Sequence, residues 1–399
     1  MSSNISEKRK NIISIIGFLS IPISGFVTDI YLPSFPAMAK TLMVPESSIQ
    51  LTLTCFLLSY GISQLFIGSF LDAIGRYYPK LISLVIVLIS SLAIAFTDNI
   101  LFICLLRIIQ GIAVSIIVIS TRALFVDIHT PEKAKHYLGY FTIAWSCGPI
   151  IAPFLGGFLE KLFNWHANFY FLAIYAFILL ALEIGFGFET IASKTKLNLK
   201  NTVEIYKMML QNKVFVLGIM IQAIAYSIVM LFNITGPFLI ENIFKFNSVV
   251  IGYCTLILGF SWMIGGFVGK KRMHLDFKES IGLPVVIQLI LIVLLILIGF
   301  FVQNLFVLMA FAFFIHICSG ILFTSFFTAN MMKFPKNAGI AGGLMGGMTY
   351  VITSFTSFIV SVTGKIDSQN GLSWRYLIFS VFLLLIISVL LKVSDKKTV

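Results

Sequence analysis

The sequence predicts an all-α membrane protein with twelve transmembrane helices arranged as two six-helix bundles. Of its 399 residues, 59% are hydrophobic and only 11% are charged. A soluble domain typically has about 45–50% apolar and about 25% charged residues. The apolar residues, 59% of 399 or about 235, would fill roughly twelve spans of about 20 residues each. One long polar interval, residues 189–213, divides the apolar runs into six and six.

Each predicted span is an apolar run bounded by charged or turn-forming residues. The first follows the basic stretch Lys8-Arg9-Lys10 and lacks a small-residue cleavage site, so we expect it to stay in the protein as an anchor. In chain order the spans are 11–38, 49–71, 80–97, 100–126, 138–160, 167–188, 214–239, 248–269, 281–302, 304–330, 338–363 and 373–392.

The basic residues predict the orientation of the chain. With the N-terminus in the cytoplasm, 21 of the 28 lysines and arginines fall in inner segments, five in outer segments and two, Arg107 and Arg122, within a span. An excess of Lys and Arg is typical of cytoplasmic loops. We therefore expect both termini in the cytoplasm and a multi-pass protein of the inner membrane. The net charge of +12 then meets anionic lipid headgroups rather than nucleic acid.

The spans define two predicted domains, an N-terminal bundle over residues 1–188 and a C-terminal bundle over residues 214–399. The lysine-rich segment 189–213 between them is expected to be a solvated cytoplasmic linker with some amphipathic helix. Paired halves of this kind are typical of secondary transporters, which bind their substrate near the membrane midplane and rock between two open states. One chain contains both halves, so we expect a monomer.

Two charges lie deep within the predicted spans, where an ionisable side chain costs several kcal/mol and needs a partner or a function. Counted from the outer helix ends at 1.5 Å per residue, Asp29 lies roughly 13 Å deep and Arg107 roughly 12 Å deep. The two side chains either pair directly or face one water-filled cavity; a purely structural role is the alternative for each. A carboxyl group there can hold a proton or attract a cation, but not both at once, which is a sufficient basis for exchange.

Other polar residues give weaker signals. Glu183 lies toward the inner end of the sixth span and is expected at the interface, with a coupling role as the alternative. His316, among phenylalanines in the tenth span, is expected to be a hydrogen-bonded packing residue. Gln222 and Asn233 of the seventh span are candidates for neutral contacts to a substrate.

The inner ends of the second and fourth spans carry two acids and two bases. Snorkelling would explain the bases alone, but the acids beside them favour an ion-pair latch that breaks and re-forms as the halves rock. The four residues are Asp72, Arg76, Arg122 and Asp127.

Glycine and proline gather in the fifth and eleventh spans. Pro149 and Pro153 each remove a backbone donor, so the fifth span is expected to bend or to borrow partners at the interface between the halves. In the eleventh span, glycines at 339, 343 and 347 predict close packing against another helix, a contact that could also be the moving joint.

The 40 phenylalanines mostly face lipid or fill the core, and a minority lining a central cavity would suit flat, lipophilic molecules. The five cysteines lie in apolar runs with no CxxC pair and no histidine at ligand spacing, so they predict neither a metal site nor a disulfide.

Several segments resemble signatures of the major facilitator superfamily. Residues 68–80, with Gly68, Asp72, Gly75 and Arg76, resemble its loop between spans two and three. The other matching segments are Arg107-Ile-Ile-Gln110-Gly111 and Arg122 to Asp127 of span four, and Gly148-Pro149 to Gly156-Gly157 of span five, which is similar to an antiporter signature. Asp29-Ile-Tyr31-Leu32-Pro33 and the doubled proline with Ala152 are similar to the bicyclomycin-resistance drug-efflux subfamily.

The resemblance implies roles for these positions. Asp29 and Tyr31 would take part in proton coupling or cation recognition, and Arg107 with Gln110 would support proton transfer. The cytoplasmic gate would consist of Asp72, Gly75, Arg76, Arg122 and Asp127, and the antiport interface of Gly148, Pro149, Pro153, Gly156 and Gly157. Ile21 stands where some related exporters carry a second acid, which puts dicationic substrates and a two-proton stoichiometry in doubt.

We therefore expect a proton-driven exporter of drugs or small amphiphilic molecules, with no cofactor. A dedicated carrier of one metabolite, such as a siderophore, amino-acid derivative or sugar, is the alternative within transport. An enzyme is not expected, because the five histidines show no HExxH or paired ligand spacing. A channel would more often be built through oligomeric symmetry than from two covalently joined halves. The sequence contains no nucleotide-binding glycine-rich loop with a lysine, so ATP is not expected to be the energy source.

Overall fold

The computed structural model describes residues 6–191, 193–194, 197, 199–272, 277–334 and 337–395, and all regular structure in them is helical. Eleven helices in this part of the chain are long and apolar enough to cross a membrane. The prediction of an all-α membrane protein is therefore confirmed. At the place of the fifth predicted span lies α7 (Pro131–Leu162), which is not among the eleven, so the count of twelve spans stays a prediction.

The helices form two groups in chain order. The N-terminal bundle contains α1 (Glu7–Ser20), α2 (Ile23–Asp29), η2 (Leu32–Ser34), α3 (Phe35–Thr41), α4 (Glu46–Ile74), α5 (Tyr77–Ala95), α6 (Ile100–Ile128), α7 and α8 (His166–Phe186). The C-terminal bundle contains α10 (Lys213–Phe238), η3 (Leu239–Ile243), α11 (Ser248–Lys271), α12 (Phe277–Gly299), α13 (Leu305–Lys333), α14 (Ala338–Val362) and α15 (Gln369–Asp395).

The first predicted span is broken into four helical pieces over Glu7–Thr41. Proline lacks a backbone donor, so it is tolerated at the start of a helix and interrupts the interior. Pro22 caps α2, Pro33 lies within η2 and Pro36 lies in the first turn of α3. These breaks end α2 on the buried Asp29.

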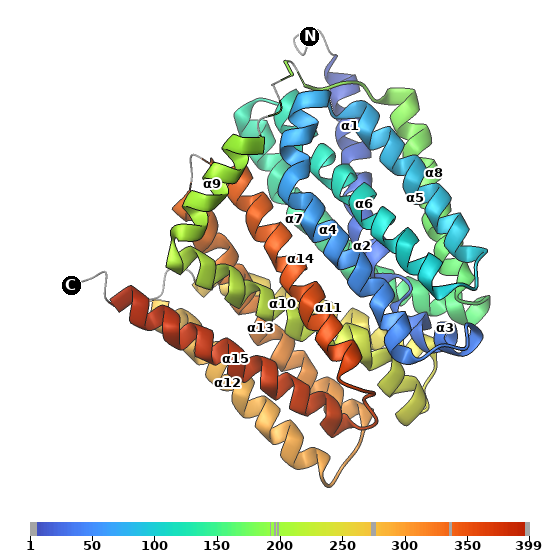
Figure 1. The fold of residues 1–399 in the computed structure, drawn as a ribbon, viewed down its shortest axis with the longest axis vertical. Coiled ribbons are helices and arrows are strands. Elements are labelled where there is room, and N and C mark those ends of the chain that lie inside the picture. Colours follow the sequence, from blue (N-terminus) through green and yellow to red (C-terminus); the bar gives the residue numbers. More distant parts are fainter. Residues whose placement is uncertain are drawn as a thin grey trace.

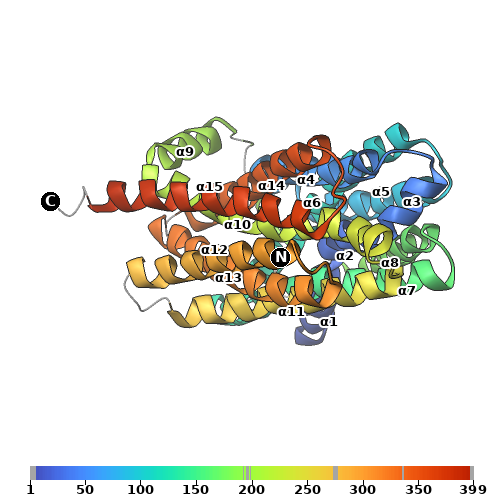
Figure 2. The same cartoon turned by 90° about the horizontal axis from the view of Figure 1, so that it is seen from below.

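The two bundles lie side by side, with α4 packed against α14 and α7 against α11 along the seams between them. Figure 1 shows the bundles converging toward one end and standing farther apart at the end that carries the N-terminus. We call the N-terminal end the inner end, following the predicted orientation. Seen from below in Figure 2, the C-terminal helices lie lengthwise beside the N-terminal bundle.

The linker contains the amphipathic helix α9 (Leu199–Gln211), as expected from its sequence. The hydroxyl of Tyr206 donates to the Leu65 carbonyl of α4 (2.7 Å), and Thr202 shares a hydrogen bond of 2.9 Å with Ser69. On its other side, Met209 is fully buried in a cluster with Phe215 and residues of α14. The helix therefore touches both bundles near their inner ends (Figure 1).

Candidate functional site

The structure brings Asp29 and Arg107 to the same level of the N-terminal bundle, as their predicted depths require. The Asp29 side chain is 1% exposed and that of Arg107 is fully buried. Arg107 interacts electrostatically with the Asp29 carboxylate, but its Nη1 donates to the Val27 carbonyl (2.9 Å) and to Gln110 Oε1 (2.8 Å). Oδ1 of Asp29 has no hydrogen-bond partner among the described residues.

Aromatic rings enclose the Arg107 guanidinium. Its central carbon lies 4.6 Å from the ring centroid of Tyr31 and 4.5 Å from that of Phe56, a geometry in which the ring faces attract the cation. The Tyr31 hydroxyl bonds to Thr52 (3.0 Å). Of the predicted coupling residues, Asp29, Tyr31, Arg107 and Gln110 thus form one buried group.

A chain of aromatic rings continues from this group into the C-terminal bundle. Phe56 stacks on Tyr60 (5.6 Å), and Tyr60 meets Tyr350 of α14 edge to face at 4.8 Å. Tyr350 lies 5.7 Å from Tyr226 of α10, which lies 6.0 Å from Trp262 of α11. These five residues, which we call the aromatic cluster, join four helices of both bundles.

Asp29 interacts with this cluster across the boundary between the bundles. Its carboxylate interacts electrostatically with the hydroxyl groups of Tyr226 and Tyr350. Tyr226 is 9% exposed. A buried carboxylate of one bundle is therefore within electrostatic range of two phenol groups of the other.

The outer ends of the bundles are joined by two ion pairs. Lys40 of α3 pairs with Glu241 of η3 at 2.5 Å, and Glu46 of α4 pairs with Lys365 at 3.0 Å. Asn242 also donates to Glu46 (3.0 Å). We call these contacts the outer clamp, because each one links the N-terminal to the C-terminal bundle.

At the inner edge, Arg76 pairs with Asp72 (2.9 Å) and with Asp127. Both pairs join helices of the N-terminal bundle, so in this conformation neither spans the two halves. Arg122 stands apart from them: it is exposed, and its guanidinium points toward Gly342 of α14.

Gly75 at this edge has a φ of +106°, which favours glycine. A side chain there would collide with Glu189, whose carboxylate accepts hydrogen bonds from the backbone N–H groups of Arg76 (2.9 Å) and Tyr77 (3.2 Å) at the start of α5. Thr190 donates to Asp127 (2.7 Å). The start of the linker is thereby fixed to the predicted gate.

The glycines and prolines of α7 face two different neighbours, and α7 continues through both prolines. Gly148 and Pro149 lie against Gly25 of α2, and Gly156 lies against Ile30. Two other residues of the motif face α11 of the other bundle: the Pro153 carbonyl faces Gly252, and the Gly157 carbonyl accepts from Ser248 (3.1 Å). The motif packs tightly on both sides.

Glu183 lies in the last turn of α8, toward the inner end of the sixth predicted span, and its side chain is buried between helices. It is 3% exposed and forms an ion pair with the equally buried Lys80. A carboxylate at this depth is stable only with such a partner. Both side chains are buried because α5 and α8 pack along their length and enclose them.

The remaining polar residues lie within the C-terminal bundle. His316 Nε2 bonds to the Tyr376 hydroxyl (3.2 Å), as expected for a packing histidine. Gln222 donates to Thr349 (2.8 Å) and is 1% exposed, while Asn233 is partly exposed. In the described part of the chain, no three metal-ligating side chains come together.

Sequence reasoning missed Tyr60, Tyr226, Trp262 and Tyr350. Each lies in a helix that is apolar on nearly all sides, and such helices give no periodic signal of which side faces the other bundle. The outer clamp was missed for another reason: its charges come from four separate chain segments near the membrane surface.

A helical protein with eleven apolar spans among its described residues, two bundles and a buried charged group has the organisation of a membrane transporter, not of an enzyme. Residues 17–357 match the sequence profile of the Major Facilitator Superfamily. The chain belongs to this family, and its motif resemblance is thereby confirmed.

Curated relatives cover nearly the whole chain at low identity. The bicyclomycin resistance protein homolog of Haemophilus influenzae is 25% identical over 355 residues, 87% of each chain. Multidrug resistance protein D of Escherichia coli is 23% identical over 335 residues, 83% of each chain.

Solved structures of other transporters share the fold. A bacterial homolog of the human lysosomal transporter Spinster, inward-facing and occupied, has a TM-score of 0.74 at 13% identity, with 97% of this chain and 96% of that chain covered. The xylose transporter XylE of Escherichia coli, partially occluded and inward open, has a TM-score of 0.73 at 15% identity, with 97% and 98% covered.

Proposed function

We propose that this transporter exports drugs or small amphiphilic molecules across the inner membrane in exchange for protons. The observation that carries the proposal is Asp29, a buried carboxyl group with an unpartnered oxygen, held beside Arg107 and facing Tyr226 and Tyr350 of the other bundle. Movement of one bundle against the other changes what surrounds this carboxyl group.

The chemistry of exchange follows from the charge of Asp29. As a carboxylate, the group attracts a cationic or polarised substrate; as a carboxylic acid, it does not. A proton and a substrate therefore compete for one state of the protein, and each drives the release of the other. The energy source in this scheme is the proton gradient, no cofactor takes part, and a single chain supplies both halves.

The chemistry of the aromatic cluster favours a lipophilic substrate. Tyr and Trp rings offer large apolar faces with few directional demands, and their faces also attract cations. Flat or cationic molecules of different shapes can use the same rings. The names of the two relatives, which refer to bicyclomycin resistance and multidrug resistance, agree with this substrate class.

The proposal is tested with the purified protein in proteoliposomes under an imposed pH gradient. Lipophilic cations, neutral antibiotics and siderophores are screened for gradient-driven transport, and each hit is repeated with Asp29→Asn. The matched control is Asp98→Asn, because Asp98 is an exposed aspartate outside the helices. We expect several unrelated substrates, and at least a tenfold loss of gradient-driven transport in Asp29→Asn alone.

A second readout isolates the coupling step. Adding substrate to the detergent-solubilised protein in weak buffer should release protons from the wild type and from Asp98→Asn, but not from Asp29→Asn. Gradient-driven transport that survives Asp29→Asn unchanged would refute the role of this residue. A single substrate among all compounds would instead identify a dedicated carrier.

A further inference from the structure

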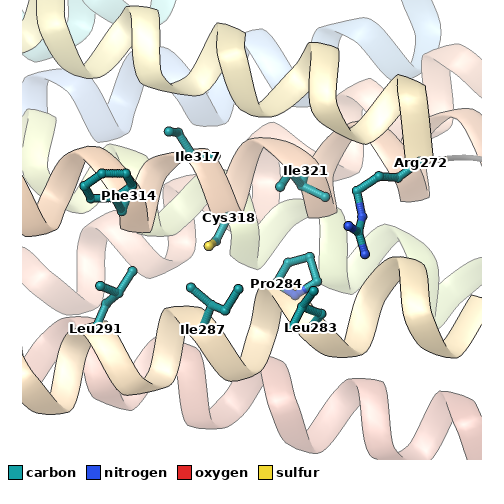
Figure 3. A pocket seen from close by; sticks show the side chains of 9 residues that line it. All are labelled: Arg272, Leu283, Pro284, Ile287, Leu291, Phe314, Ile317, Cys318 and Ile321. Atoms are coloured by element: carbon teal, nitrogen blue, oxygen red, sulfur yellow. The ribbon is translucent and has the colours of Figure 1, made fainter.

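A groove of about 410 Å³ runs along the C-terminal bundle where α12 packs against α13, away from the aromatic cluster. Figure 3 shows that its walls are two rows of apolar side chains, one from each helix. The rows consist of Leu283, Ile287 and Leu291 on α12, and Phe314, Cys318 and Ile321 on α13. The α12 residues are spaced four apart and so share one face of that helix.

The groove opens to the outside of the bundle. Its floor is formed by buried residues, with Cys318 5% and Ile321 7% exposed. Its rims are exposed, with Leu283 at 52% and Phe314 at 53%. In a membrane-spanning helix an exposed apolar rim faces lipid, so the groove is accessible from the bilayer.

One end of the groove carries a cation. Of the nine described residues that line it, Arg272 is the charged one, and the other eight are apolar. Its guanidinium points toward Pro284 and Leu283 at the end of the two rows (Figure 3). Arg272 follows Lys270 and Lys271, the last residues of α11, at the predicted cytoplasmic surface.

We propose that this groove binds one anionic phospholipid, with its phosphate on Arg272 and an acyl chain between α12 and α13. Guanidinium groups form strong, charge-assisted hydrogen bonds to phosphate, and basic pockets between membrane helices on the cytoplasmic side suit anionic headgroups. The α12 row from Leu283 to Leu291 extends about 12 Å. Over this length an acyl chain in the groove contacts protein side chains instead of other lipids.

The molecule provides its own comparison site. A second apolar groove of about 400 Å³ lies between α5 and α8 and includes Ile82, Val85 and Ile184. Its described lining residues include no lysine or arginine. This groove should accept acyl chains without regard to headgroup charge.

The test is native mass spectrometry of the full-length protein in detergent, titrated with phosphatidylglycerol or phosphatidylcholine. For the wild type we expect one tightly retained phosphatidylglycerol, bound at least fivefold more strongly than phosphatidylcholine. Arg272→Gln should abolish this preference, and Cys318→Trp, which fills the groove, should reduce retention of both lipids. If Cys318→Trp does not fold, Ile287→Trp fills the groove from its exposed rim.

Two controls separate a built site from general surface charge. Lys271→Gln removes a neighbouring charge that does not line the groove, and Ile184→Trp obstructs the groove between α5 and α8. Both should keep the preference for phosphatidylglycerol. An equal loss of the preference for phosphatidylglycerol in Lys271→Gln and Arg272→Gln would overturn the proposal. Unchanged lipid retention in both Cys318→Trp and Ile287→Trp would also overturn it.

Discussion

Arg107 donates a hydrogen bond of 2.9 Å to the carbonyl oxygen of Val27, two residues before Asp29. The bond anchors the end of α2 to α6 and holds the guanidinium where it interacts electrostatically with the carboxylate, while Oδ1 of Asp29 has no hydrogen-bond partner among the described residues. A group that must gain and lose a proton needs a neighbouring charge, but a fully satisfied ion pair would hold it in one state. This geometry leaves Asp29 able to change state.

The first prediction concerns the coupling between these two charges. Arg107→Met removes the hydrogen bonds to Val27 and Gln110 together with the electrostatic interaction with Asp29, so we expect a loss of stability of about 1.5–3 kcal/mol for each hydrogen bond to the charged group. Adding Asp29→Asn removes the uncompensated charge and should recover part of that loss, with a coupling energy of about 0.5–3 kcal/mol. Thermal unfolding of the four proteins in detergent measures the cycle. A double variant no more stable than Arg107→Met would contradict the coupling.

The second prediction separates a structural acid from a coupling acid. Glu183→Gln leaves the ammonium of Lys80 buried and unpaired, so it should cost about 3–5 kcal/mol of stability. The double variant Lys80→Met with Glu183→Met removes both charges and should be about as stable as the wild type or more stable. If the pair is structural, this double variant keeps gradient-driven transport. A stable double variant that transports without regard to pH would assign the coupling to Glu183 instead.

Much of the fold follows from the sequence because a bilayer imposes strict rules. Every span needs a long apolar run and internally satisfied backbone groups, so runs and charges locate the helices within a few residues. Depth is equally predictable, since a fixed rise per residue places Asp29 and Arg107 at one level before any contact is known.

Helix rotation and pairing across the bundles are not predictable in this way. Hydropathy places Glu183 toward the inner end of its span but does not show that α5 brings Lys80 to the same interior. The same limit hides Tyr226 and Tyr350, which lie in helices without a polar face. Contacts between ends of distant segments, such as Lys40 with Glu241, depend on how the bundles meet, which no local pattern records.

The third prediction concerns the crossing of α4 and α14. A Cβ atom added to Gly347 would lie 2.8 Å from the carbonyl oxygen of Gly61, whereas one added to Gly339 on the same helix meets nothing within 4 Å. Gly347→Ala should therefore push the bundles apart at this crossing and reduce transport at least tenfold. Gly339→Ala should transport normally, because alanine favours helix by up to about 1 kcal/mol over glycine. The prediction is checked by measuring transport rates and thermal unfolding of the two variants. Equal transport rates and equal stability would mean that α4 and α14 can separate at this crossing without loss of function.

The outer clamp leads to the fourth prediction, on the balance between conformations. Its ion pairs are partly exposed, so each contributes about 0.2–1 kcal/mol, and losing one shifts the equilibrium between closed and open outer ends by up to about fivefold. Glu241→Lys goes further, since it places two like charges at the Lys40 contact and should open the outer end. The exchanged pair, Lys40→Glu with Glu241→Lys, restores the attraction and should close it again.

The opening can be followed by distances between spin labels at Met43 and Phe246, exposed positions beside the two sides of the clamp, in a background without the native cysteines. Glu241→Lys should add a longer distance that the exchanged pair removes. High salt should act in the same direction as the loss of one pair, because the Debye length falls from about 30 Å at 0.01 M to about 3 Å at 1 M. If the distance between the two labels in Glu241→Lys is the same as in the wild type, the clamp does not hold the outer end closed. Closure would then depend on uncharged contacts, such as that between Gln50 and the Ile234 carbonyl (3.4 Å).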